Sequence, residues 1–142
     1  MLRAAAIGVL ASFALNLVWE NAQAFLYRGY EGLSQHFWTC FIATLGDVVI
    51  VAAIYGAVSV LWCDYGWYKR ITIAKITCAA LFGLGTAIVI EAWALAAGRW
   101  AYDGMPLLPF IPLGLTPLLL MIILPPVAFA IMRVEQARSV ED

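Results

Sequence analysis

Four long apolar runs set the fold of this sequence, and they lie at about residues 4–27, 37–62, 71–97 and 110–132. Each run can cross a bilayer as a helix, which takes roughly 20 residues. Charged residues make up 12% of the chain, against roughly 25% in a typical soluble domain. No linker or soluble domain separates the runs. We therefore predict a single transmembrane domain over residues 1–142, an all-α membrane protein built as a four-helix bundle.

The last two runs carry features that affect helix packing. Ala79, Gly83 and Ala87 form a row of small residues that lets another helix approach closely. The fourth run contains several prolines, and a proline inside a helix removes a backbone hydrogen bond. They are Pro112, Pro117, Pro125 and Pro126. The sequence therefore predicts that the fourth helix is kinked.

Lysine and arginine residues lie mainly on one side of the four predicted spans. With an even number of spans, both termini and the 63–70 connection share a side, and the opposite side holds only Arg28 and Arg99. The shared side carries Arg3, Lys69, Arg70, Lys75, Arg133 and Arg138. Because basic residues gather in cytoplasmic loops, we predict a multi-pass protein of a bacterial-type inner (plasma) membrane with both termini in the cytoplasm. The net charge of −1 provides no basic field for nucleic acid.

The first run ends in NLVWENAQAFLY, residues 16–27, where polar side chains interrupt the apolar pattern. Spacings of four, three and four residues put these side chains on one helix face: Asn16, Glu20, Gln23 and Tyr27. A polar stripe inside a bilayer has to face protein or water rather than lipid. We therefore predict that this face points into the bundle.

Two further carboxyl groups lie inside the apolar runs, Asp47 in the second and Glu91 in the third. With Glu20 they place three acids in the middle or outer half of the membrane, where an ionised group costs about 2.5–3.5 kcal/mol. Polar side chains can simply hold helices together, but acids inside a membrane usually mark a functional site. Burial favours the neutral form of a carboxyl group. Arg99 is the only nearby cation, and we predict that it pairs with Glu91 or Glu20.

A neutral carboxyl group in a dry pocket can act as a Brønsted acid toward a lipid-like substrate, such as an isoprenoid alkene or epoxide. Aromatic faces stabilise the resulting carbocation by about 2 kcal/mol or more when water is excluded. The predicted catalytic acids are Glu20, Asp47 and Glu91. The predicted substrate-binding side chains are Asn16, Trp19, Gln23, Trp93, Arg99, Trp100 and Tyr102. This reaction needs neither a metal nor a cofactor, and the sequence offers no clear site for either.

Two of these segments resemble a known family. NLVWENAQAFLY followed by LGDVVIVAAIY is similar to the N-x-x-W-E helix and the following L-D-V-type helix of the fungal integral-membrane meroterpenoid (terpene) cyclases. The resemblance implies that Glu20 serves as an acid and that Asp47 matches the early aspartate of the motif region. It covers about residues 1–60. No position here matches the catalytic aspartate that lies late in that family's longer, seven-span chain.

The connection GRWAYDGMPLLPFIPLG more weakly resembles the W-x-Y and proline-rich loop of the small heterodimeric lycopene cyclases, without the paired glutamates that follow there. The whole chain is also similar to small four-span bacterial membrane proteins of unassigned function. Together these resemblances imply a membrane-embedded, acid-initiated cyclase or isomerase of an isoprenoid lipid.

Two other functions fit the same sequence. A non-catalytic small subunit of a membrane complex would bind a lipid, quinone or carotenoid, because small and aromatic residues suit helix docking. A proton-coupled carrier would use the acids as a relay, but only Tyr55 and Ser59 offer polar groups between Asp47 and the cytoplasm. The expected partners are a hydrophobic lipid-like molecule and membrane lipids. A homo-oligomer and a larger membrane complex both stay open.

Overall fold

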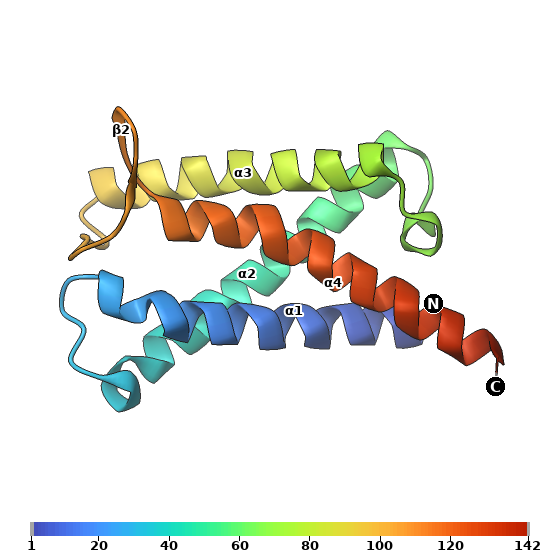
Figure 1. Ribbon diagram of the computed structural model, residues 1–142, viewed down its shortest axis with the longest axis horizontal. Helices are drawn as coiled ribbons and strands as arrows, with labels where there is room; N and C mark the ends of the chain where they lie inside the picture. The colour runs from blue at the N-terminus through green and yellow to red at the C-terminus, as the bar shows by residue number, and fades with distance from the viewer. Residues whose placement is uncertain (1, 142) are drawn as a thin grey trace.

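The computed structural model describes residues 2–141, with side chains described for residues 3–137. It is an all-α four-helix bundle (Figure 1), as the sequence predicts. The long helices are α1 (Leu2–Gln23), α2 (Leu33–Leu61), α3 (Ile73–Ala96) and α4 (Leu115–Glu141). The short elements are the 3-10 helices η1 (Ala24–Leu26) and η2 (Trp67–Arg70) and the strands β1 (Leu107–Leu108) and β2 (Ile111–Gly114). All four long helices are long and apolar enough to cross a membrane, so the chain is a multi-pass membrane protein.

The connections divide the bundle into two ends (Figure 1). Both termini and the α2–α3 connection with η2 lie at one end, which we call the terminal end. The α1–α2 connection and the β1–β2 hairpin lie at the opposite end, which we call the hairpin end. Helix α4 runs between α1 and α3 and packs against both, while α2 packs mainly against α1.

The apolar core follows the same division. One buried cluster gathers around Val58, Trp67 and Phe129, close to the terminal end. A second cluster includes Leu113 and Leu118, close to the hairpin. The aromatic side chains of the first cluster and the aliphatic side chains of the second therefore anchor α4 at both ends of its length.

Small residues let α4 approach its neighbours closely. The row Ala79, Gly83 and Ala87 is buried on α3, and Gly83 lies against the Met121 backbone carbonyl, where a Cβ would clash. On α1, a glycine at position 8 leaves room for the Met132 side chain in the same way. The small-residue row therefore has the packing role that the sequence predicts.

The fourth apolar run differs most from its predicted form. Helix α4 begins at Leu115 rather than near residue 110, because residues 107–114 form an antiparallel hairpin. Phe110 lies at the turn with a φ of 69°, in the left-handed region. Pro112 lies in strand β2, and a proline is tolerated there because the hairpin leaves one strand edge unpaired. The first three helices match their predicted runs closely.

Helix α4 contains three prolines, two of which lie where the helix changes its neighbour. Pro117 falls in the first turn, where a missing N–H costs no helical hydrogen bond. Pro125 and Pro126 lie in the interior and remove such bonds. Before this pair Met121 contacts α3, and after it Met132 contacts α1. Figure 1 shows α4 bending from α3 toward α1 along its length, in keeping with the predicted kink.

Candidate functional site

The polar face of α1 points into the bundle, as the sequence predicts for Asn16, Glu20 and Gln23. The prediction that Tyr27 continues this helix face is wrong, because α1 ends at Gln23 and Tyr27 is extended after η1. Asn16 and Gln23 are buried, and Glu20 between them is half-buried. The Gln23 amide donates to Glu20 Oε1 at 2.8 Å, and the Trp19 indole donates to Gln23 Oε1 at 3.2 Å. This chain of bonds fixes one oxygen of the Glu20 carboxyl group and leaves Oε2 without a donor among the described side chains.

Asn16 lies about one turn deeper on the same face. Its Nδ2 donates to the Ser12 carbonyl oxygen at 2.7 Å and lies 3.3 Å from the Ser12 hydroxyl oxygen. Its Oδ1 is buried and accepts no hydrogen bond from any described residue. Because a buried, unpaired polar atom is costly, this oxygen suits a polar group of a ligand or a water molecule.

Glu91 on α3 is buried and is held by the loop that follows the helix. The Tyr102 hydroxyl donates to a carboxylate oxygen of Glu91 and accepts from the Gly114 backbone N–H at 2.9 Å. The indole N–H of Trp100 is buried close to the same carboxyl group. Neutral donors, rather than a cation, therefore position Glu91.

The same loop is tied to the segment that follows α1. Backbone hydrogen bonds of 2.8 and 2.9 Å flank an isolated antiparallel bridge between Tyr27 and Tyr102. The ring centroids of Tyr27 and Tyr102 are 5.8 Å apart, and those of Tyr27 and Trp100 are 6.3 Å apart. Three aromatic rings from two distant parts of the sequence thus gather at the hairpin end, next to the carboxyl groups of α1 and α3.

Asp47 on α2 completes a group of three acids from three helices. We call Glu20, Asp47 and Glu91 the acid cluster. Glu20 lies close enough to both of the others for their charges to interact. The Cys40 thiol contacts the Glu20 backbone carbonyl at 3.6 Å, which joins α2 to α1 about two helical turns from Asp47. Asp47 Oδ2 is buried and has no hydrogen-bond partner among the described residues.

Two tyrosines beside the acid cluster keep their protons. Burial raises the pKa of Tyr27, and the negative charge of Glu91 raises it further. Burial also raises the pKa of Tyr102, and so does its hydrogen bond to Glu91. Both hydroxyl groups are therefore neutral, and that of Tyr102 donates to Glu91.

Arg99 does not pair with an acid, contrary to the prediction from the sequence. Its guanidinium carbon lies 6.0 Å from the centroid of the exposed Trp93 ring. Gly98, with a φ of 64°, ends α3 and turns the chain, so that Arg99 is exposed. Among the described side chains the ion pairs are Arg3–Glu135 and Lys75–Asp64, both at the terminal end. The acid cluster thus has no cationic partner within this part of the chain.

The structure brings most of the predicted substrate-binding side chains to the acid cluster. Those with a contact to an acid or to its partners are Trp19, Gln23, Trp100 and Tyr102, and Asn16 continues the same helix face. Trp93 and Arg99 lie on the outer surface instead. The side chains of the predicted polar face therefore lie at the acid cluster, whereas Trp93 and Arg99 at the end of α3 do not.

Sequence reasoning missed three contributors to this site: Ser12, Cys40 and Gly114. Ser12 lies one helical turn before Asn16, so the same spacing rule would have found it. Cys40 acts from a neighbouring helix, and Gly114 acts through its backbone N–H at the end of the hairpin. No signal in the sequence pairs either residue with its partner.

Comparison of the chain with protein-family models, with curated proteins and with solved structures gives no match. The acid cluster and its partners are therefore the basis for assigning a function.

Proposed function

We propose that the chain is a membrane-embedded cyclase or isomerase that uses the acid cluster to protonate an isoprenoid lipid. The observation that carries this proposal is the convergence of three carboxyl groups from three helices, with no cation among the described side chains. A desolvated carboxyl group without a counter-ion is favoured in its neutral form, and the charge of a neighbouring carboxylate strengthens that preference. We assign the proton to Glu20, with Asp47 and Glu91 ionised beside it. A neutral acid can give its proton to a substrate.

Glu20 is the proton donor. Gln23 holds Oε1, so the proton lies on Oε2 and passes to a carbon of the substrate double bond. The π electrons of that bond form the new C–H bond and leave a carbocation on the neighbouring carbon. The faces of Tyr27, Trp100 and Tyr102 stabilise this cation. In a cyclase a second double bond then attacks the cation, and in an isomerase a proton leaves directly.

Asp47 is the base. Its buried Oδ2 has no partner among the described residues, so it is available to accept the proton that leaves the substrate. The electrons of the broken C–H bond form the double bond of the product. A proton transfer from Asp47 to the neighbouring Glu20 then restores the starting state. Glu91, held by Tyr102, contributes a fixed charge that tunes both acids. Protons balance over the cycle, so no co-reactant is needed.

The decisive experiment replaces the donor. Glu20→Gln keeps the shape of the side chain but removes the acidic proton, so turnover should fall by about 10²–10⁴-fold. Glu31→Gln, in the exposed α1–α2 connection, is the matched control and should keep wild-type turnover. Purified protein in liposomes is supplied with prenylated alkenes and epoxides, and products are identified by gas chromatography with mass spectrometry. Identical product profiles for wild type and Glu20→Gln would refute the proposed enzyme activity.

We further propose that the terminal end faces the cytoplasm of a bacterial-type inner membrane and that the substrate enters from the outer leaflet. The proposal rests on the basic residues of the terminal end, five of which have described side chains; that of Arg138 lies outside the described residues. A tag inserted in the 28–36 connection should react with a membrane-impermeant reagent on intact cells, whereas a C-terminal tag should not. The reverse labelling pattern would overturn this orientation.

A non-catalytic subunit that binds a lipid, quinone or carotenoid is the second candidate. The exposed apolar face of α3, which includes Leu81, Val89 and Trp93, favours it because this face can contact another membrane helix. A proton-coupled carrier would need a polar path through the terminal half. The Tyr55 and Ser59 hydroxyls there already donate to backbone carbonyls. Equal turnover of wild type and Glu20→Gln, together with a copurified partner chain, would favour the subunit.

A further inference from the structure

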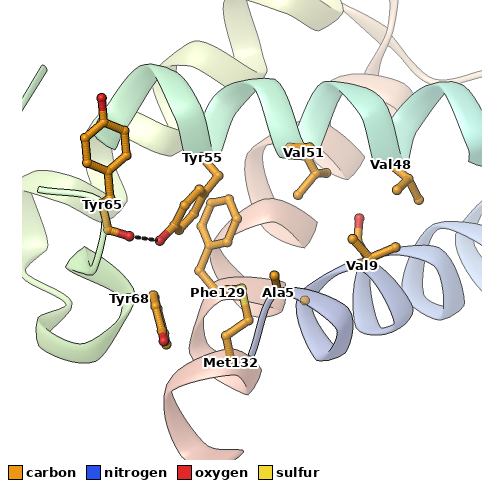
Figure 2. Close-up of a pocket in the computed structure, with 12 residues that line it drawn as sticks. Ala5, Val9, Val48, Val51, Tyr55, Tyr65, Tyr68, Phe129 and Met132 are labelled. Carbon is orange, nitrogen blue, oxygen red and sulfur yellow. Dashed lines mark hydrogen bonds between the residues drawn. The ribbon is translucent and has the colours of Figure 1, made fainter. Parts of the chain in front are cut away.

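A cavity of about 350 Å³ lies in the terminal half of the bundle, apart from the acid cluster. Helices α1, α2 and α4 and the segment before α3 surround it (Figure 2). Val9 and Ser12 line it from α1, Ala52 from α2, Tyr68 from η2 and Met132 from α4. The residues of the acid cluster are not among those that line it.

The walls of this cavity are apolar although three tyrosines contribute to them. The Tyr55 hydroxyl donates to the Tyr65 backbone carbonyl at 2.6 Å (Figure 2), and the Tyr68 hydroxyl donates to Gln136 Oε1 at 3.3 Å. The Ser12 hydroxyl oxygen is already contacted by the amide of Asn16. A buried water needs two to four polar partners, and these walls offer few. The cavity therefore suits hydrocarbon.

Tyr55 and Phe129 line one wall of the cavity, and the ring of Trp67 packs against both of them. The rings of Tyr55 and Trp67 are stacked at 5.3 Å, and Phe129 meets Trp67 edge-on at 5.1 Å. Trp67 is fully buried, so the stack is fixed in the core. Two residues of the opposite wall, Val9 and Ala52, are exposed on the outer surface. The cavity is therefore preformed and opens between α1 and α2 toward the surrounding lipid.

Unpaired positive charges follow the lining residues in the sequence. Lys69 and Arg70 come directly after Tyr68, and Arg133 comes directly after Met132. All three are exposed, and none belongs to an ion pair among the described side chains. The terminal end of the bundle (Figure 1), where this cavity lies, is thus basic, which complements an anionic head group at the membrane surface.

We propose that this cavity binds one acyl chain of an anionic phospholipid from the leaflet at the terminal end, with the head group on Lys69, Arg70 and Arg133. The volume exceeds the cavity of about 150 Å³ that holds a benzene molecule, and it lies at the lower end of the range of small-ligand pockets, roughly 300–1,000 Å³. It therefore accommodates a single chain rather than a whole lipid. This binding is independent of the reaction proposed for the acid cluster.

Native mass spectrometry tests the chain-binding part of the proposal. The purified full-length protein in detergent is mixed with equal amounts of phosphatidylglycerol and phosphatidylcholine. Wild type should retain one phosphatidylglycerol, and Ala52→Phe, which fills the cavity, should lower the bound fraction about tenfold. Ala53→Phe is the matched control, because Ala53 is exposed and does not line the cavity. Equal retention by these two variants would overturn the proposal.

A second pair of variants keeps the test decisive if Ala52→Phe does not fold. Ala5 lines the cavity from α1 and Ala6 beside it does not, so Ala5→Phe should release the lipid and Ala6→Phe should not. Size-exclusion profiles and melting curves establish that each variant is folded. A lipid-free dimer that Ala5→Phe dissociates would instead assign the cavity to a second copy of the chain, and would refute lipid binding.

A separate experiment tests the part of the proposal that concerns the lipid head group. Replacing Lys69, Arg70 and Arg133 together with alanine should abolish the preference for phosphatidylglycerol over phosphatidylcholine, while either lipid can still place a chain in the cavity. The Arg28→Ala, Arg99→Ala double variant, altered at the hairpin end, should keep the preference. Equal binding of both lipids by wild type would refute the proposal that the site selects an anionic head group.

Discussion

The buried charged and acidic side chains at the two ends of the bundle have different kinds of partner. At the terminal end, the buried ammonium of Lys75 lies 2.9 Å from Asp64, and the Arg3 guanidinium lies 3.0 Å from Glu135. At the hairpin end, Glu20 accepts from the Gln23 amide and Glu91 from the Tyr102 hydroxyl, and the acid cluster has no cation among the described side chains. The buried charge of the terminal end, on Lys75, is therefore paired, whereas the acids of the hairpin end have no cation among the described side chains.

This contrast separates two roles for a polar group in a membrane. A counter-ion holds a carboxylate in its charged form, which suits the task of joining one segment to another. An acid that is held by neutral donors can gain and lose a proton without losing its partners, which general acid–base chemistry requires. The kind of partner, more than the presence of an acid, distinguishes the end that we propose to be reactive from the structural end.

The largest effect is expected when a cation is placed in the acid cluster, because the hairpin end would then resemble the terminal end. Gln23→Lys would place an ammonium group where the amide now donates to Glu20 and would hold that carboxyl group in its charged form. We expect turnover to fall by about 10²–10⁴-fold while the protein stays folded. Product formation in liposomes measures the first effect and a melting curve measures the second.

The control for this change is Asn21→Lys. Asn21 is half-buried on α1, and its amide donates to the Leu17 carbonyl rather than to an acid. A lysine there adds the same charge at nearly the same depth, so turnover should stay close to that of wild type. Full turnover in Gln23→Lys would contradict the need for a neutral Glu20.

A smaller effect is expected when the acid cluster loses a neutral donor. Tyr102→Phe removes the hydroxyl that donates to Glu91 and accepts from Gly114. Leaving these groups unpaired should cost about 1–3 kcal/mol of unfolding free energy, measured by denaturant unfolding in detergent micelles. Tyr65→Phe is the control, because the Tyr65 side chain is exposed. If both variants were equally stable, the hairpin would not depend on this bond.

The fold was predictable from the sequence because helix length and apolar content are local properties. The polar face of α1 was predictable for the same reason, since the spacing of Asn16, Glu20 and Gln23 fixes their common direction. The hairpin was not predictable, because residues 107–114 are as apolar as the helix that follows. Their prolines do not distinguish them either, because α4 contains Pro117, Pro125 and Pro126.

The partners of the acids were harder to predict than the helices that carry them. Arg99 is near Glu91 in sequence, and the prediction paired them by distance along the helix. The turn at Gly98 directs Arg99 to Trp93 instead. The donor that reaches Glu91 is Tyr102, whose position depends on a bridge to a residue far away in the sequence. Long-range contacts of this kind leave no periodic signal.

The smallest expected effect is on the stability of the terminal end, and it depends on the titration of Asp64. The hydrogen bond from Lys75 holds the pKa of Asp64 below its ordinary value, and the Gly66 backbone N–H, which donates at 3.0 Å, acts in the same direction. A carboxyl group whose pKa is depressed in the folded state stabilises the fold above its unfolded pKa, about 3.9. That contribution is lost as the pH falls through the folded pKa.

We therefore expect the melting temperature of wild type to exceed that of Asp64→Asn by a few degrees near neutral pH. The difference should shrink as the pH is lowered from about 5 to 3, since wild type then loses the charge that the variant already lacks. Comparing the two proteins at each pH cancels the titration of the other acids. A difference that stays constant over this range would mean that the Lys75 ammonium does not depend on the Asp64 charge. The terminal end would then hold an unpaired buried charge of its own, and the contrast between the two ends would no longer stand.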